Sequence, residues 1–181
     1  MSNNGFFRIT SIAAIASSGL ALMIAVTAIV SIFVPGIMDI IVYVLMLITD
    51  VFIFFTLTGV YFIQYQRLSN LGLAGYLIAI VGLLCSYIFA PLMWTLFPVG
   101  LLLLTIATQR ARVLPSAPLW IWFVGVLIAI PMAILGASIL FASGMLTVAV
   151  GRAWLGIAVW NANETPAQQP AKINETATVG D

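Results

Sequence analysis

The sequence predicts an all-α membrane protein, a bundle of six transmembrane helices. Two observations lead to this prediction. Hydrophobic residues make up 64% of the 181 residues and charged residues only 6%, whereas soluble domains carry roughly 25% charged residues. Apolar runs of about 20 residues, the length that crosses a bilayer, recur along the chain between short polar or proline-containing segments. With so few charges, most of the protein surface must face lipid.

Six spans account for the apolar runs. The first run is about 23 residues long, which exceeds the core of about 7 to 15 residues in a signal peptide, so we interpret it as a retained helix. Pro35 and Gly36 end it. The predicted spans, which together form a domain over residues 1–160, are 12–34, 39–63, 71–89, 91–108, 119–136 and 139–160.

The break between the last two spans has two possible positions. The apolar run from Leu119 to Trp160 is too long for one helix. It can turn near Gly136-Ala137-Ser138 or near Ala142-Ser143-Gly144. We favour the first, because the second would leave a final helix of only about 16 residues, which is short for a span. Residues 161–181 lack the apolar content to fold and are predicted to be a disordered cytoplasmic tail.

Basic residues predict the orientation. With six spans, every Lys and Arg outside the predicted helices falls on the side of the termini, whereas the opposite loops carry Asp39 and no Lys or Arg. Basic loops stay in the cytoplasm, so we expect both termini there and the protein in the plasma (inner) membrane. The basic residues are Arg8, Arg67, Arg110, Arg112 and Lys172. Aromatic residues expected at the cytoplasmic interface are Tyr61, Tyr65, Trp120, Trp122 and Trp160, with Trp94 at the opposite one.

Composition argues against several classes of function. There is no His, and the one cysteine, Cys85, lies in an apolar segment, where we expect it to be a packing residue. The five acidic residues are scattered, so we predict no metal site and no cofactor. No catalytic motif is present, and we do not expect an enzyme. A net charge of +1 argues against nucleic acid as a partner.

Small residues recur along two of the predicted helices. Such stripes let neighbouring backbones approach closely, which is how membrane helices associate. We interpret them as contacts within the bundle, with a homo-oligomer or a larger membrane complex as the alternative. The helix-packing candidates are Ala13, Ser17, Ala21, Ala25, Gly72 and Gly75.

Asp50 is the most unusual residue of the sequence, because it lies inside the second span. Tyr43, Tyr61 and Gln64 fall within about 40° of it on a helical projection, so this helix carries one polar line. A charge at mid-membrane costs about 2.5–3.5 kcal/mol and is normally paired inside the bundle. Only Arg152 lies at a comparable depth, about 20 Å from its helix end against about 16 Å for Asp50.

Three interpretations of Asp50 follow. It forms an ion pair with Arg152 that locks the second helix to the sixth. Alternatively, it stays protonated and hydrogen-bonds a neighbouring hydroxyl or carbonyl, while Arg152 extends to the cytoplasmic interface. In the third interpretation, Asp50 is the binding group of a transport site for a proton or small cation.

Three segments of the chain, residues 67–82, 100–130 and 151–160, resemble a known group of proteins. Residues 107–115 read ATQRARVLP and residues 154–160 read WLGIAVW. A turn of the form A-T-x-R-A-x-V-L-P and a final W-L-G-x-x-x-W stretch are similar to those of a widespread group of uncharacterised bacterial six-helix membrane proteins. The resemblance implies a six-helix bundle in a bacterial inner membrane, and it implies no activity.

Two hypotheses of function remain. The first is a non-enzymatic accessory, scaffold or oligomeric membrane protein that acts through helix packing. Its basis is the lack of catalytic groups, the short loops and the small-residue stripes. The alternative is a small transporter or channel for a proton, cation or small solute that uses Asp50, with Tyr43, Tyr61 and Gln64 along its path.

Overall fold

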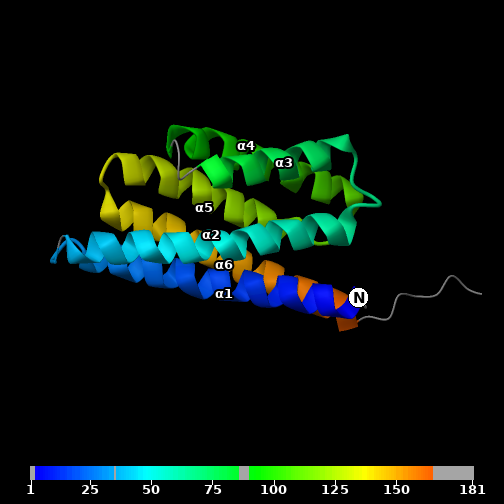
Figure 1. Ribbon diagram of the computed structural model, residues 1–181, viewed down its shortest axis with the longest axis horizontal. Helices are drawn as coiled ribbons and strands as arrows, with labels where there is room; N and C mark the ends of the chain where they lie inside the picture. Colours follow the sequence, from blue (N-terminus) through cyan, green and yellow to red (C-terminus); the bar gives the residue numbers. More distant parts are fainter. Residues whose placement is uncertain (1–2, 35, 86–89, 165–181) are drawn as a thin grey trace, which may run out of the picture.

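The computed structural model describes residues 3–34, 36–85 and 90–164, which form six helices (Figure 1). Each predicted span contains one helix, although the bounds differ. The first helix begins at Asn3 rather than residue 12, and the last continues to Glu164, so residues 161–164 are helical instead of part of the tail. Residues 86–89 and 165–181 lie outside the described part. The helices are α1 (Asn3–Val30), α2 (Ile37–Gln64), α3 (Asn70–Cys85), α4 (Ala90–Ala111), α5 (Ala117–Ile134) and α6 (Ser138–Glu164).

Four of these helices are long and apolar enough to cross a membrane: α1, α2, α5 and α6. The apolar segments Asn70–Cys85 of α3 and Thr95–Ala111 of α4 are shorter. Large hydrophobic side chains cover the outside of the bundle, among them Ile12, Leu77 and Ile157. A soluble monomer rarely exposes such extensive apolar surface. The chain is therefore a membrane protein.

The helices run back and forth along one long axis, which gives the bundle two distinct ends (Figure 1). We call the end that holds the start of α1, the close of α6 and the α2–α3 and α4–α5 connections the terminal end. The opposite end holds the α1–α2 and α5–α6 turns. Arg67 and Arg112 belong to the connections at the terminal end, and Arg110 lies in the last turn of α4.

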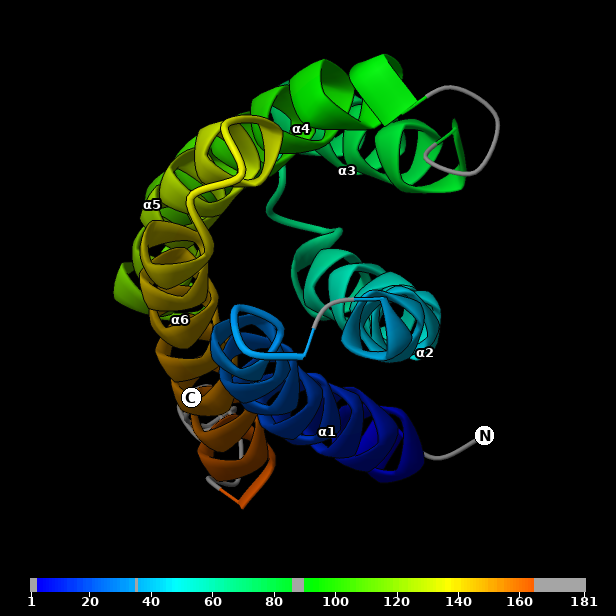
Figure 2. The same cartoon turned by 90° about the vertical axis from the view of Figure 1, so that its left-hand side faces the viewer.

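Viewed along the axis, the helices form an open ring (Figure 2). α6 packs on both α1 and α5, and α1 packs in addition on α2. α3 packs mainly on α4, while the α4–α5 and α2–α3 contacts are much sparser. α2 is therefore held by α1 and lies across the interior from α5 and α6, rather than packing directly on α6.

The small residues of α1 lie inside the bundle. Ala13, Ser17, Ala21 and Ala25 are all buried, because their spacing of four puts them on one helix face. On the same helix, the Ser11 hydroxyl donates to the Gly156 carbonyl oxygen over 2.7 Å and so joins α1 to α6. A polar bond between close-packed backbones is typical of membrane helix pairs.

Glycines allow close approach within the two tightest remaining pairs. A Cβ built on Gly75 of α3 would lie 2.5 Å from the Leu104 backbone nitrogen of α4, and one on Gly144 of α6 would lie 2.6 Å from the Ala129 nitrogen of α5. Gly72 is also buried, but its nearest neighbour is Leu68 of the preceding loop rather than another helix. These helix pairs approach closely only because the side chain is absent.

The turn between α5 and α6 lies at the first of the two positions considered. α5 ends at Ile134 and α6 begins at Ser138. Gly136 has a φ of +67°, in the left-handed region that costs a residue without a Cβ little. The second position, around Ser143, lies inside α6.

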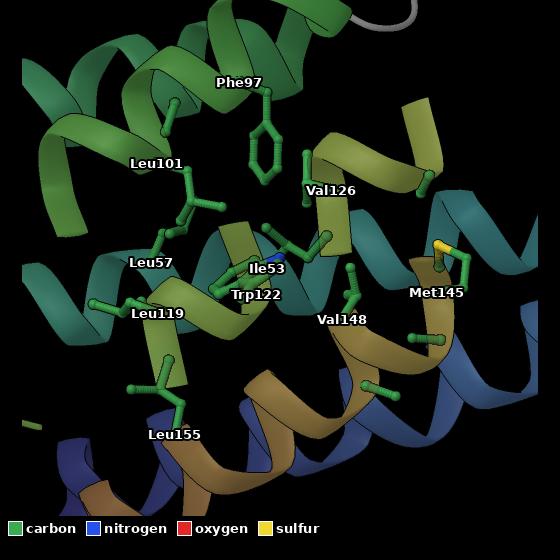
Figure 3. Close-up of a cluster of buried hydrophobic side chains, with 14 of the residues drawn as sticks. Ile53, Leu57, Phe97, Leu101, Leu119, Trp122, Val126, Met145, Val148 and Leu155 are labelled. Carbon is green, nitrogen blue, oxygen red and sulfur yellow. The ribbon is translucent and has the colours of Figure 1, made fainter. Parts of the chain in front are cut away.

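Five large apolar side chains meet near the middle of the bundle (Figure 3). They come from α2, α4, α5 and α6, and each has an exposed fraction of 0%. Side chains of this size that are fully buried in one cluster pack closely against each other. We call this group the apolar layer; it consists of Leu57, Leu101, Leu119, Trp122 and Leu155.

Candidate functional site

A cavity of about 270 Å³ lies between α2 on one side and α5 and α6 on the other. Ile24 of α1 and Phe97 of α4 complete its wall. Most of the lining is apolar, and the side chains with polar atoms are Tyr43, Thr49, Asp50 and Arg152. An apolar cavity with a few polar groups is the usual form of a small-molecule site.

Helical spacing explains the α6 wall of the cavity. Phe141, Met145, Val148 and Arg152 recur at intervals of three or four residues, so they share one face of α6. Phe141 lies close to the α5–α6 turn, and Arg152 lies about 16 Å further along the helix. The cavity therefore extends from near the opposite end to the depth of Arg152.

Arg152 is 3% exposed and contacts two other helices. Its Nη1 donates to the Ser17 carbonyl oxygen of α1 over 3.4 Å. Its guanidinium carbon lies 4.7 Å from the centroid of the Trp122 ring on α5, a cation–π contact. Its Nε has no hydrogen-bond partner among the described residues. Arg152 is thus held within the bundle, and does not extend to the terminal end.

Asp50 lines the same cavity from α2. Its side chain is half-buried, and its charge interacts electrostatically with the Arg152 guanidinium. The neighbouring Thr49 hydroxyl forms a hydrogen bond within its own helix, donating to the Leu45 carbonyl oxygen over 2.6 Å. α2 and α6 do not pack directly on each other, and the two opposite charges line the cavity between these helices.

The polar line on α2 is divided. Tyr43 lines the cavity with Asp50, but Tyr61 does not; its ring stacks on Tyr76 of α3 with centroids 4.6 Å apart. Gln64 is 1% exposed, and its Nε2 donates to the Thr108 hydroxyl of α4 over 3.2 Å. The Gln64 Oε1 has no partner among the described residues. The four residues therefore belong to three different environments.

The apolar layer separates these environments. Ile53, Phe97 and Val126 line the cavity (Figure 3). Leu57 and Leu101 follow Ile53 and Phe97 by four residues, and Trp122 precedes Val126 by four on the oppositely directed α5, so each lies closer to the terminal end. Four residues make about one helical turn, or roughly 6 Å. The layer thus lies about one helical turn from the cavity, on the side of the terminal end.

A second hollow, of about 1000 Å³, opens at the terminal end. It lies between the first turns of α1, the last turn of α2 and the connections that follow α2 and α4. Phe6, Ile9 and Phe62 form apolar parts of its wall, and Arg67 and Arg112 are its charged lining residues. We call it the terminal cleft. Gln64 also lines it, so the cleft begins on the far side of the apolar layer from Asp50.

Sequence reasoning missed the role of Trp122. It was expected at the cytoplasmic interface, but it has an exposed fraction of 0% and lies over Arg152 in the core. Trp122 lies near the start of α5, and its ring faces the Arg152 guanidinium of the neighbouring helix α6. Tyr65 and Trp160 are exposed. The side chain of Trp94 lies outside the described residues.

No group of three or more His, Cys, Asp or Glu side chains comes together in the described ranges. Cys85 is a free, half-buried thiol at the end of α3. The arrangement that is present can hold and orient a small molecule between opposite charges. The chain matches no protein-family model, no curated protein and no solved structure.

Proposed function

We propose that the chain spans the inner membrane six times, with both termini in the cytoplasm, as a member of the bacterial group that its motifs resemble. The antiparallel course of all six helices supports this (Figure 1). α4 has 22 residues, which at 1.5 Å per residue covers roughly 33 Å, and the apolar sequence after α3 continues to Phe89. Basic residues at the terminal end support its cytoplasmic location.

Within this arrangement, the protein is a small transporter, and Asp50 is its binding group for a proton or small solute. The observation that carries the proposal is the cavity that ends on Asp50 and Arg152. Intramembrane ionisable groups that line a cavity mark substrate and proton paths. The outer half of the bundle thus offers a binding site that a solute reaches from the extracytoplasmic side.

The apolar layer favours a transporter over a channel. A channel needs a continuous polar path, whereas on α2 the fully buried Leu57 lies between Ile53 of the cavity and Phe62 of the terminal cleft. Hydrophobic constrictions of this kind block the passage of ions and water. A solute bound at Asp50 would cross only after the helices rearrange, which is how transporters work.

The second candidate is an accessory or scaffold protein in which Asp50 and Arg152 are structural. The contacts of Arg152 favour it, because one side chain reaches the Ser17 carbonyl on α1 and the Trp122 ring on α5. A buried charge that loses its partner destabilises a fold strongly, whereas removing both charges costs less. The two candidates therefore predict different results for the same substitutions.

Proton flux into proteoliposomes, followed with a trapped pH-sensitive dye, separates the candidates. A transporter shows flux above that of empty liposomes, Asp50→Asn abolishes it, and Asp50→Glu retains part of it. The matched control is Asp39→Asn, the same change about three turns earlier on the helix, which should leave the flux intact. If every variant behaves like empty liposomes while the Asp50→Asn/Arg152→Gln double variant is more stable than either single variant, the structural candidate is correct.

Thiol labelling tests the cavity itself. In a Cys85→Ser background, a cysteine at Val126 lines the cavity, and one at Val124 on the same helix lies on its exposed, lipid-facing side. A membrane-impermeant maleimide added from the extracytoplasmic side should label the first and not the second. Equal protection of both positions would mean that the cavity is closed to water, which contradicts the proposed site.

A further inference from the structure

We infer that the terminal cleft binds the headgroup of an anionic phospholipid of the inner leaflet. This site lies beyond the proposed transport function, since it shares no lining residue with the Asp50 cavity. It rests on the proposed orientation, which places the terminal end of the bundle at the cytoplasmic surface of the membrane, and not on the proposed transport. Its ligand class follows from the charges, the walls and one backbone feature of the cleft.

The charges of the cleft select an anion. Arg67 follows α2 and Arg112 follows α4, so two separate connections each bring one guanidinium to the same hollow. No Asp or Glu is among the described residues that line it. Guanidinium groups bind phosphate oxygens through paired N–H donors. Both arginines line the hollow, and in the proposed site both bind the phosphate group of one lipid.

The walls of the cleft select a lipid over a soluble phosphate. Phe6, Ile9 and Phe62 line it, and all three are apolar. Phe6 and Phe62 contact each other edge to face, with ring centroids 5.7 Å apart, and so form a joined apolar surface between α1 and α2. A soluble anion gains nothing from such a wall, whereas the glycerol backbone and first methylenes of a phospholipid bury apolar surface against it. Basic pockets between membrane helices on the cytoplasmic side are known binding places for acidic headgroups.

Gln64 adds a neutral acceptor at the inner end of the cleft. Its side chain lines the hollow, and its Oε1 is buried without a hydrogen-bond partner in the described part of the chain. An unpartnered buried acceptor costs free energy unless a donor reaches it. A headgroup that carries a hydroxyl, such as phosphatidylglycerol, supplies a phosphate for the arginines and a donor of this kind in one molecule.

The backbone of Arg112 supports a binding role. Its φ is +54°, in the left-handed region that L residues other than glycine rarely adopt. Glycine would fit this position without strain, so the arginine is present despite its backbone conformation. Strain of this kind concentrates at ligand sites. Arg110, two residues earlier, is exposed in the last turn of α4 and does not line the cleft.

The test compares phosphatidylglycerol with phosphatidylcholine on the purified full chain in detergent, by the rise in unfolding temperature during lipid titration. Wild type should bind phosphatidylglycerol more tightly than phosphatidylcholine. Arg67→Gln and Arg112→Gly should each weaken phosphatidylglycerol binding about fivefold, the effect of about 1 kcal/mol per basic residue at a lipid surface. Arg110→Gln is the matched control, and it should bind phosphatidylglycerol as wild type does.

Arg112→Gly keeps the test independent of folding. Because glycine relieves the strained φ, this variant should unfold in phosphatidylcholine at a temperature no lower than that of wild type. A lower temperature would make Arg112 structural and overturn the inference. The inference would also be overturned if Arg110→Gln weakened phosphatidylglycerol binding as much as the cleft variants do, since the lipid would then respond to the general surface charge of the protein. If millimolar inorganic phosphate competes with the lipid, and this competition also depends on Arg67, the ligand of the cleft is a soluble phosphate and the lipid proposal is wrong.

Discussion

The guanidinium of Arg152 lies over the indole ring of Trp122, 4.7 Å from its centroid, and both side chains are almost completely buried. The ring thus carries two roles at once. It stabilises the cation that faces the cavity, and it is the largest member of the apolar layer next to that cavity. The positive charge and the barrier are consequently coupled through one side chain.

The first prediction concerns this pair. Trp122→Leu should destabilise the bundle, because it removes both the aromatic face and core volume. In an Arg152→Met background, the same change should cost less by about 1–2 kcal/mol, the value of a desolvated cation–π contact. Unfolding in mixed micelles of a mild detergent and dodecyl sulfate measures both. Equal costs in the two backgrounds would show that the ring acts by packing alone.

The glycine contacts between α3 and α4 give a second prediction. Gly75→Ala should destabilise the protein by about 1–3 kcal/mol, because its Cβ would meet the Leu104 backbone and overpack the interface. Gly19→Ala is the matched control: Gly19 is an exposed residue of α1 with no atom within 4 Å of a built Cβ. The control should be neutral or slightly stabilising, since alanine favours a helix. Thermal unfolding in detergent compares the two.

Gln64 provides a third prediction, for a polar contact between α2 and α4. Thr108→Val removes the hydroxyl that accepts the Gln64 amide proton, and should cost about 1 kcal/mol. Thr105→Val, one turn earlier, removes only a local bond to the Leu101 carbonyl and should cost less. Both threonine side chains are fully buried, so the two substitutions change the desolvation of a hydroxyl group to the same extent. A larger cost for Thr105→Val would mean that the Gln64 contact contributes nothing to stability.

The fourth prediction tests the apolar layer as a barrier. Leu57→Ala should open a water path between the cavity and the terminal cleft, and so raise the passive proton leak of proteoliposomes. It should also lower stability by about 2–5 kcal/mol, as large-to-small core substitutions do. Leu77→Ala removes the same atoms from a half-exposed position on α3, and should change neither the leak nor the stability appreciably. An unchanged leak in Leu57→Ala would place the barrier elsewhere.

Regular patterns in the sequence anticipated much of the fold. Apolar runs with breaks at Pro35-Gly36 and Gly136 predict the positions of the helices, because membrane length and glycine conformation are local properties of a chain. The stripe from Ala13 to Ala25 predicts a buried face for the same reason. The start of α1 and the end of α6 were not predicted correctly, because a membrane helix continues into the interface wherever its backbone hydrogen bonds remain satisfied.

The site was predicted only in part. Asp50 and Arg152 were identified from the sequence because a charged side chain inside a membrane costs free energy, and both residues line one cavity. The division of the polar line was not predictable, because it depends on which helices flank α2, and a projection of one helix says nothing about its neighbours. Trp122 and the terminal cleft were missed for a related reason: each is assembled from segments far apart in the chain.

The sparse contacts of the α3–α4 pair have a mechanical consequence. The two helices are joined tightly through Gly75, and they are attached to α2 and α5 by few contacts (Figure 2). If α3 and α4 tilted together as a rigid unit, only the sparse α2–α3 and α4–α5 contacts would be broken, which is less packing than any other helix pair would lose. Helix α4 of this pair contributes Phe97 to the cavity wall and Leu101 to the apolar layer. Such a movement would displace Phe97 and Leu101 together, because both residues belong to α4.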